Sequence, residues 1–133
     1  MKKTGLLNAE LSKVIAGMGH TDTLVIADAG LPIPKGVPVI DLALRQGMPG
    51  FIETLETVLS ELEVEGGVVA NEMRDTSPAM HKVLIDLWAK RAPLEHTANH
   101  DEFKAMSQHA KAVVRTGEFT AFSNIILVAG VVF

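Results

Sequence analysis

The stretch GMGHTDTLVIADAG, residues 17–30, places His20, Asp22 and Asp28 on either side of a short apolar run. An imidazole has an ordinary pKa of about 6.5, so His20 can give or take a proton at cellular pH. A histidine after a helix-ending glycine is also typical of a helix C-terminus, where it interacts with the helix dipole. From these residues alone both interpretations of His20 stay open, and the helix end is the commoner one.

The two aspartates each have a functional and a structural interpretation. Asp22 lies two residues beyond His20, so its carboxylate either accepts a hydrogen bond from the imidazole or caps the turn before the strand. Asp28 ends the apolar run, and Glu118 follows the run KAVVRTG in the same way. In open α/β sheets the carboxyl ends of strands converge on a ligand-binding crevice. This favours Asp28 and Glu118 as site residues, although Asp28 could also bond only its own turn.

The apolar run between His20 and Asp28 limits how the two can act together. A strand rises about 3.3 Å per residue, so the stretch from Thr23 to Ala27 separates its ends by about 13 Å. Both side chains reach one small ligand only if the chain folds back or another subunit supplies one of them. We therefore expect a site that is shared across a subunit boundary.

The segment EHTANHDE, residues 95–102, contains a weak metal-binding pattern. His96 and His100 are four residues apart, with Asp101 adjacent, but no glutamate lies between them as in a zincin. Asn99 is typical of a helix cap that would break the spacing. The sequence therefore predicts no metal site here.

Other catalytic chemistries find no support in the residue types. The chain contains no cysteine, which excludes thiolate nucleophiles and cysteine-based metal sites. It also has no serine in a G-x-S-x-G elbow, and its glycine-containing stretches lack the phosphate-binding spacing. What remains is acid–base and hydrogen-bonding chemistry on a small polar ligand, without a cofactor.

Alternating strand and helix patterns must position these residues. Apolar positions at three- and four-residue spacings predict helices, and short β-branched runs bounded by Gly, Pro or charged residues predict strands. Asn8 is expected to cap the first helix and Ser77 the one that Pro78 begins. The predicted helices are 8–17, 48–64, 77–91 and 99–110, and the predicted strands 23–27, 37–44, 66–73, 93–97, 111–117 and one within 123–133. The order predicts an α/β three-layer sandwich, with a mixed, partly parallel central sheet flanked by helices.

Composition bounds the class of protein. A chain of 133 residues fits a single domain, 1–133. A net charge of -4 with only 5% aromatic residues argues against nucleic-acid binding. No apolar stretch reaches the roughly 18 residues of a membrane span or resembles a signal peptide, so we expect a cytoplasmic protein. The mean hydropathy of +0.25 is high for so small a chain and predicts that other subunits cover some apolar surface.

Three segments resemble a known family: LLNAELSKVIAGMGHTDTLVIADAGLPIP, IDLAL and VVRTGEFTAFSNIIL. In these segments the chain is similar to the D-ribose pyranases, of the ribose and fucose mutarotase group. The resemblance implies a cofactor-free isomerase that interconverts the pyranose and furanose forms of D-ribose, so that imported sugar reaches ribokinase. It also implies a cytoplasmic homo-oligomer, typically a decamer of two stacked pentameric rings, with sites near subunit contacts.

The resemblance implies roles for particular residues. The family's catalytic histidine falls on His20 in the G-H-x-D motif, its sugar-binding aspartate on Asp28, and a further binding histidine on His100 of NHDEF. Exchange of ring size requires opening the hemiacetal to the aldehyde and closing it through another hydroxyl, which acid–base groups can catalyse. We expect His20 to act as general acid or base, with Asp22 and Glu118 in supporting positions.

The family's last binding segment, usually Tyr-Ala-Asn or Tyr-Ser-Asn, falls on Phe122, Ser123 and Asn124. Phe122 departs from the pattern because it lacks the hydroxyl that a tyrosine could offer the sugar, although its ring could still stack on the pyranose. A mutarotase for fucose or another sugar therefore stays open. Two further alternatives are a sugar-binding accessory protein without catalysis and a structural oligomer whose histidines are incidental.

Overall fold

A six-stranded mixed sheet forms the centre of the computed structural model, which describes residues 1–133. Its strands lie in the order β2-β5-β1-β6-β3-β4. They are β1 (Thr23–Ala27), β2 (Val39–Asp41), β3 (Val64–Ala70), β4 (Leu94–Thr97), β5 (Ala112–Arg115) and β6 (Ile125–Ala129). Only β6 pairs antiparallel with its neighbours, β1 and β3. The predicted mixed, partly parallel sheet is confirmed.

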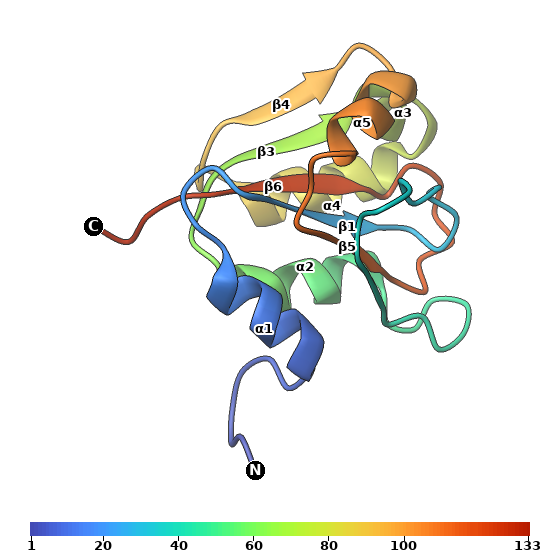
Figure 1. Cartoon of the computed structure of the whole chain (residues 1–133). Coiled ribbons are helices and arrows are strands. Elements are labelled where there is room, and N and C mark those ends of the chain that lie inside the picture. The colour runs from blue at the N-terminus through green and yellow to red at the C-terminus, as the bar shows by residue number, and fades with distance from the viewer.

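Helices lie on both faces of the sheet (Figure 1). They are α1 (Ala9–Gly17), α2 (Phe51–Leu59), α3 (Asn71–Thr76), α4 (Pro78–Trp88) and α5 (His100–Ser107). Residues of α1 to α4 pack in one apolar cluster, and Phe103 of α5 packs in a second cluster on the other face. The three layers predicted from the sequence are confirmed. No helix has both the length and the apolar composition that crossing a membrane requires.

The central strand β1 is buried on both faces. Leu24 and Ile26 belong to the cluster under α1 to α4, while Val25 and Ala27 belong to the cluster under α5. Successive side chains of a strand point to opposite faces of its sheet. This explains why TLVIA contains no charged residue and why the nearest carboxylates, Asp22 and Asp28, lie just beyond the two ends of the strand.

Strand directions decide which loops meet. β1 runs parallel to β5, β5 to β2, and β3 to β4, while β6 opposes both β1 and β3. The carboxyl ends of β1 to β5 therefore lie at one edge, with the start of β6; we call this the carboxyl edge. The opposite, amino edge contains the start of β1 and the end of β6. Asp28 lies at the carboxyl edge and His20 at the amino edge.

The predicted helix caps are only partly correct. Asn8 caps α1, since its Oδ1 accepts a hydrogen bond from the Leu11 N–H at 2.9 Å. Ser77 occupies the N-cap position of α4 as predicted, but its side chain makes no capping bond, because its hydroxyl donates to the Ala121 carbonyl at 2.6 Å. Ser77 joins α3 directly to α4, and its side chain bonds the loop before β6.

The prediction that strand 66–73 extends past Ala70 is wrong, because the chain turns there into α3.

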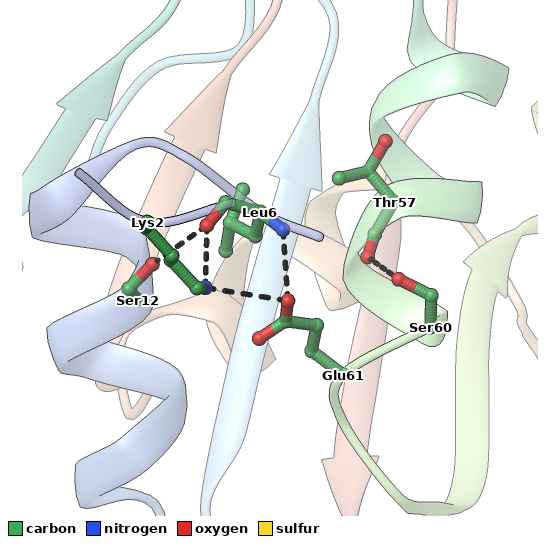
Figure 2. A network of polar contacts seen from close by, with 6 residues as sticks. All are labelled: Lys2, Leu6, Ser12, Thr57, Ser60 and Glu61. Carbon is green, nitrogen blue, oxygen red and sulfur yellow. Dashed lines mark hydrogen bonds and ion pairs between the residues drawn. The ribbon is translucent and has the colours of Figure 1, made fainter. Parts of the chain in front are cut away.

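The segment before α1 is tied to the end of α2 (Figure 2). The Leu6 N–H donates to Glu61 Oε1 at 2.8 Å, and Lys2 Nζ donates to the Leu6 carbonyl at 2.6 Å. The hydrogen bond from Leu6, together with the nearby charge of Lys2, holds the pKa of Glu61 below its ordinary value despite some desolvation. The Ser12 hydroxyl also donates to the Leu6 carbonyl, and a separate hydrogen bond from the Ser60 hydroxyl to the Thr57 carbonyl lies at the end of α2.

Candidate active site

A pocket of about 480 Å³ opens at the carboxyl edge. Its walls come from the loop after β1, the first residue of α5 and the segment between β5 and β6. Asp28, His100, Glu118 and Phe122 are among the lining residues. Small-molecule sites commonly have volumes of about 300–1,000 Å³, with a few placed polar groups, so this pocket can accommodate a monosaccharide.

Asp28 and Asn124 form a reciprocal pair beside the pocket. The Asp28 N–H donates to Asn124 Oδ1 at 2.8 Å, and Asn124 Nδ2 donates to Asp28 Oδ2 at 3.0 Å. The Gly30 N–H donates to the other carboxylate oxygen at 3.0 Å. Each oxygen of an ionised carboxylate can accept about two hydrogen bonds. The Asp28 carboxylate is therefore fixed in direction and can still accept from hydroxyl groups of a ligand.

His100 begins α5 and lines the same pocket. Its ring stacks on Phe103, with centroids 5.9 Å apart, and meets the Phe122 ring edge-on at 5.1 Å. Burial, assisted by the charge of Lys104, lowers the pKa of His100, although nearby carboxylates partly oppose this. The imidazole is therefore neutral near pH 7 and has one donor and one acceptor nitrogen.

The turn before β6 places Phe122 and Ser123. Phe122 has a φ of 62°, in the left-handed region that residues other than glycine seldom adopt. Ser123 is fully buried, and its hydroxyl has no hydrogen-bond partner. The structure thus brings together the five residues predicted to bind the sugar, with Asp28, His100 and Phe122 on the pocket wall and Ser123 and Asn124 behind it.

His20 lies at the amino edge, outside this pocket. Its Nε2 is 2.7 Å from Glu65 Oε2, and the two side chains are 55% and 43% exposed. The two residues are 45 positions apart, and only the order β1-β6-β3 brings them together. Nothing in the sequence pointed to Glu65. Within one chain, therefore, the predicted catalytic histidine does not meet the predicted sugar-binding residues.

Asp22 does not bond the imidazole of His20. Its Oδ2 accepts from the Gly19 N–H at 2.8 Å and lies 3.4 Å from Lys111 Nζ. The hydrogen bond from Gly19 and, to a smaller degree, the Lys111 ammonium keep the pKa of Asp22 below its ordinary value against slight desolvation. Within one chain Asp22 therefore caps the turn before β1 and does not bond the imidazole of His20, while its supporting role in the site stays a prediction.

Glu118 lines the pocket, but its carboxylate also organises the wall. Oε2 accepts from the Phe51 N–H at 3.2 Å, and Oε1 accepts from the Thr120 N–H at 3.0 Å. Burial opposes the charged form, but the hydrogen bonds from Thr120, Phe51 and Phe119 outweigh it and keep the pKa of Glu118 below its ordinary value. Glu118 therefore ties the start of α2 to the segment between β5 and β6.

The two histidines of the weak metal pattern point to different neighbours. His96 Nε2 lies 2.9 Å from His81 Nε2, whereas His100 packs against Phe103 and Phe122. Asn99 caps α5 by accepting from the Glu102 N–H at 2.9 Å, and the helix begins only after it. No group of three or more His, Cys, Asp or Glu side chains is arranged to hold a metal ion.

Comparison with known proteins gives a full-length match. Residues 1–132 match the model of the RbsD / FucU transport protein family. A D-ribose pyranase of Coprothermobacter proteolyticus is 53% identical over 133 residues, covering all of both chains. The structure of Bacillus subtilis RbsD complexed with D-ribose is 47% identical, with a TM-score of 0.95 over the whole of both chains. The structure of FucU from Bifidobacterium longum is 26% identical, with a TM-score of 0.77 over 95% of each. The chain therefore belongs to the RbsD / FucU transport protein family.

Proposed function

We propose that this protein has D-ribose pyranase activity: it interconverts β-D-ribopyranose and β-D-ribofuranose without a cofactor. One observation carries the proposal. The chain is about half identical, end to end, to D-ribose pyranases. The geometry agrees with this, because Asp28, held by Asn124 behind the wall, and a neutral His100 line one sugar-sized pocket. The lower similarity to FucU makes fucose the second candidate substrate.

The reaction needs proton transfers and no redox or group-transfer step. A base takes the proton of the anomeric hydroxyl while an acid protonates the ring oxygen, and the bond between the anomeric carbon and the ring oxygen breaks. The open aldehyde then closes by attack of the C4 hydroxyl, which loses its proton as the carbonyl oxygen gains one. A well-positioned acid or base contributes about 10²- to 10⁴-fold to such a step.

The pocket residues would orient the sugar. The Asp28 carboxylate accepts from hydroxyl groups and is held in direction by Asn124. The neutral imidazole of His100 can form one hydrogen bond at its pocket-facing nitrogen, and the Phe122 ring offers an apolar face. Several fixed contacts to hydroxyls select one sugar, because a buried polar group left unpaired costs binding energy.

His20 would complete the site from a neighbouring subunit. His20 and Asp28 lie at opposite edges of one sheet, so a second copy must bring its amino edge against the carboxyl edge of the first. Such a head-to-tail contact closes into a ring when the rotation allows it, in keeping with the pentameric rings expected from the family resemblance and with a stacked decamer. We also propose a cytoplasmic location, where ribokinase would use the product.

Exchange between ring forms measured by saturation-difference NMR tests the proposal. The wild-type protein should transfer magnetisation between ribopyranose and ribofuranose signals, and His20→Ala should lower the rate at least about 100-fold. His109→Ala is the matched control, because His109 is exposed and lies outside the pocket. If ribose signals shift but do not exchange, the protein binds sugar without catalysis and the proposal is wrong. If fucose exchanges faster than ribose, the proposed preference for ribose is wrong.

A further inference from the structure

Only three buried side-chain polar atoms in the protein have no hydrogen-bond partner: Glu72 Oε2, His100 Nδ1 and Ser123 Oγ. All three belong to the same region. His100 lines the pocket, Glu72 is bonded to its backbone, and Ser123 follows Phe122, whose ring contacts the imidazole. Buried polar groups without partners are rare and costly. Their gathering at one site points to a role for Glu72, which no motif singled out.

Glu72 reaches His100 because two parallel strands end side by side. Ala70 at the end of β3 is in register with Thr97 at the end of β4, and α3 and α5 begin shortly after these residues. Glu72 Oε1 accepts from the His100 N–H at 2.9 Å. This N–H is the first of α5, where a carboxylate is favoured by the helix dipole. One oxygen of Glu72 thus holds the backbone of His100 in place.

The second oxygen of Glu72 and one nitrogen of His100 are complementary. Phe103 and Phe122 contact the imidazole. Its Nδ1 is buried and has no partner, which leaves Nε2 as the nitrogen available to a ligand in the pocket that His100 lines. A carboxylate can only accept hydrogen bonds, whereas a neutral imidazole donates from one nitrogen. The two atoms are not hydrogen-bonded to each other in this structure, so Nδ1–H would reach Glu72 Oε2 through one buried water or after a small side-chain rotation.

We infer that Glu72 is a positioning residue, whose carboxylate fixes His100 as the Nδ1–H tautomer and thereby presents Nε2 to the substrate as a hydrogen-bond acceptor. The identity of the group that Nε2 accepts from, a ribose hydroxyl, rests on the proposed function. In this arrangement Glu72 does not touch the sugar. It acts through His100, by making Nε2 an acceptor for a hydrogen bond from a sugar hydroxyl.

The other charged groups near His100 are engaged elsewhere. Asp28 is paired with Asn124, and Asp101 is exposed and bonded to Lys104 Nζ at 2.9 Å. Burial and the charge of Lys104 lower the pKa of His100. The carboxylates of Glu72, Asp28 and Asp101 raise this pKa, but by less. Glu72 is the one carboxylate in this group with a buried, unpartnered oxygen.

Long-range ¹H–¹⁵N NMR of the histidine rings tests the tautomer in the full-length protein. Wild-type His100 should show the Nδ1–H pattern near pH 7. In Glu72→Gln the amide oxygen can still accept from the His100 N–H, but the NH₂ group can only donate, so His100 should change to the Nε2–H pattern. Glu102→Gln is the matched control, because Glu102 accepts from the Ala98 N–H in the same loop at 2.8 Å and leaves the ring untouched.

Kinetics separate positioning from a purely structural role. Glu72→Gln should raise the KM for ribose about tenfold, the range expected for one lost hydrogen bond, and should leave kcat within about twofold. Wild-type His100 in the Nε2–H form, or an unchanged tautomer and KM in Glu72→Gln, would overturn the inference. Failure of wild-type protein to exchange ribose would instead overturn the proposed function, while the tautomer experiment would still decide the role of Glu72.

Discussion

Phe122 is the residue at which the pocket departs from its family pattern. Its ring lines the pocket and lies edge-on to His100, on a backbone with a φ of 62°. Tyrosine has the same ring and backbone preferences, so Phe122→Tyr adds one hydroxyl with no new strain. One further hydrogen bond of about 0.5–1.5 kcal/mol should lower the KM for ribose by about two- to tenfold.

The measurement is the ring-exchange rate against ribose concentration. Phe119→Tyr is the control, because it adds the same hydroxyl to a pocket-lining side chain that is 63% exposed, where water competes for it. A KM that stays constant or rises in Phe122→Tyr would mean that a hydroxyl at this position meets no partner on the sugar.

At the scale of residues, the local sequence pattern predicted some residues of the site and the family resemblance predicted others. Asp28 could be predicted from its place at a strand end, and His100 and Asn124 from the resemblance. Glu65 and Glu72 could not be predicted, because each meets its histidine through strand neighbours distant in the sequence. A sequence pattern describes which face a residue occupies, but not which strand lies next to it.

At the scale of elements, a histidine pair joins α4 to the edge strand β4. His81 Nε2 and His96 Nε2 are 2.9 Å apart, so a stable contact holds one proton between them. Burial lowers the pKa of both, with Arg74 acting in the same direction, and His81 lowers that of His96 further; Asp75 partly opposes this at His81. The folded protein therefore binds fewer protons here than the unfolded chain does.

This difference predicts loss of stability in acid. Above the ordinary histidine pKa of 6.5 both states are neutral here, and as the pH falls below it only the unfolded chain gains protons readily. The urea midpoint should fall between about pH 7.5 and about pH 5, and by less in His96→Gln, which cannot titrate. His109→Gln, at an exposed site, should retain the wild-type pH dependence; an equal fall in all three proteins would contradict the prediction.

Elements with strong apolar patterns were predicted well, and weakly patterned ones were not. β1 and β6 are nearly continuous apolar runs buried on both faces, and periodicity alone identifies such segments. The strand predicted over 37–44 shrinks to Val39–Asp41, because β2 is an edge strand that pairs only with β5. α3 has six residues, too few for its periodicity to stand out from the strand before it.

At the scale of the whole molecule, apolar surface remains uncovered on the single chain. Leu7, Leu44, Phe119 and Phe133 are each more than 60% exposed, and exposed large apolar side chains indicate association surfaces when they gather. This agrees with the oligomer that hydropathy led us to expect, while the single domain over 1–133 and the decamer stay predictions. The arrangement of copies could not be read from the sequence, because it depends on the shapes of surfaces formed only after folding.

A shared site predicts complementation between two inactive variants. In His20→Ala the amino edge is defective and the carboxyl edge intact, whereas in Asp28→Ala the reverse holds. If each pocket takes Asp28 from one chain and His20 from the next around a ring, a mixed oligomer contains sites with both residues intact. Random assembly from equal amounts should restore about one quarter of the wild-type exchange rate, since each required neighbour occurs in about half of the positions.

The two variants should be co-expressed with different tags and purified through both, and exchange of ribose measured by NMR. Mixing His20→Ala with the double variant His20→Ala/Asp28→Ala provides the control, because no chain then supplies His20 and no activity should return. If the first mixture also stays inactive although both chains co-purify, the site is not divided between neighbours. His20 and Asp28 would then have to meet within one chain, which their positions at opposite ends of β1 make possible only through a large refolding of the strand. Recovery of activity would therefore show that the amino edge of one chain and the carboxyl edge of its neighbour form one active site, so that catalysis requires the oligomer.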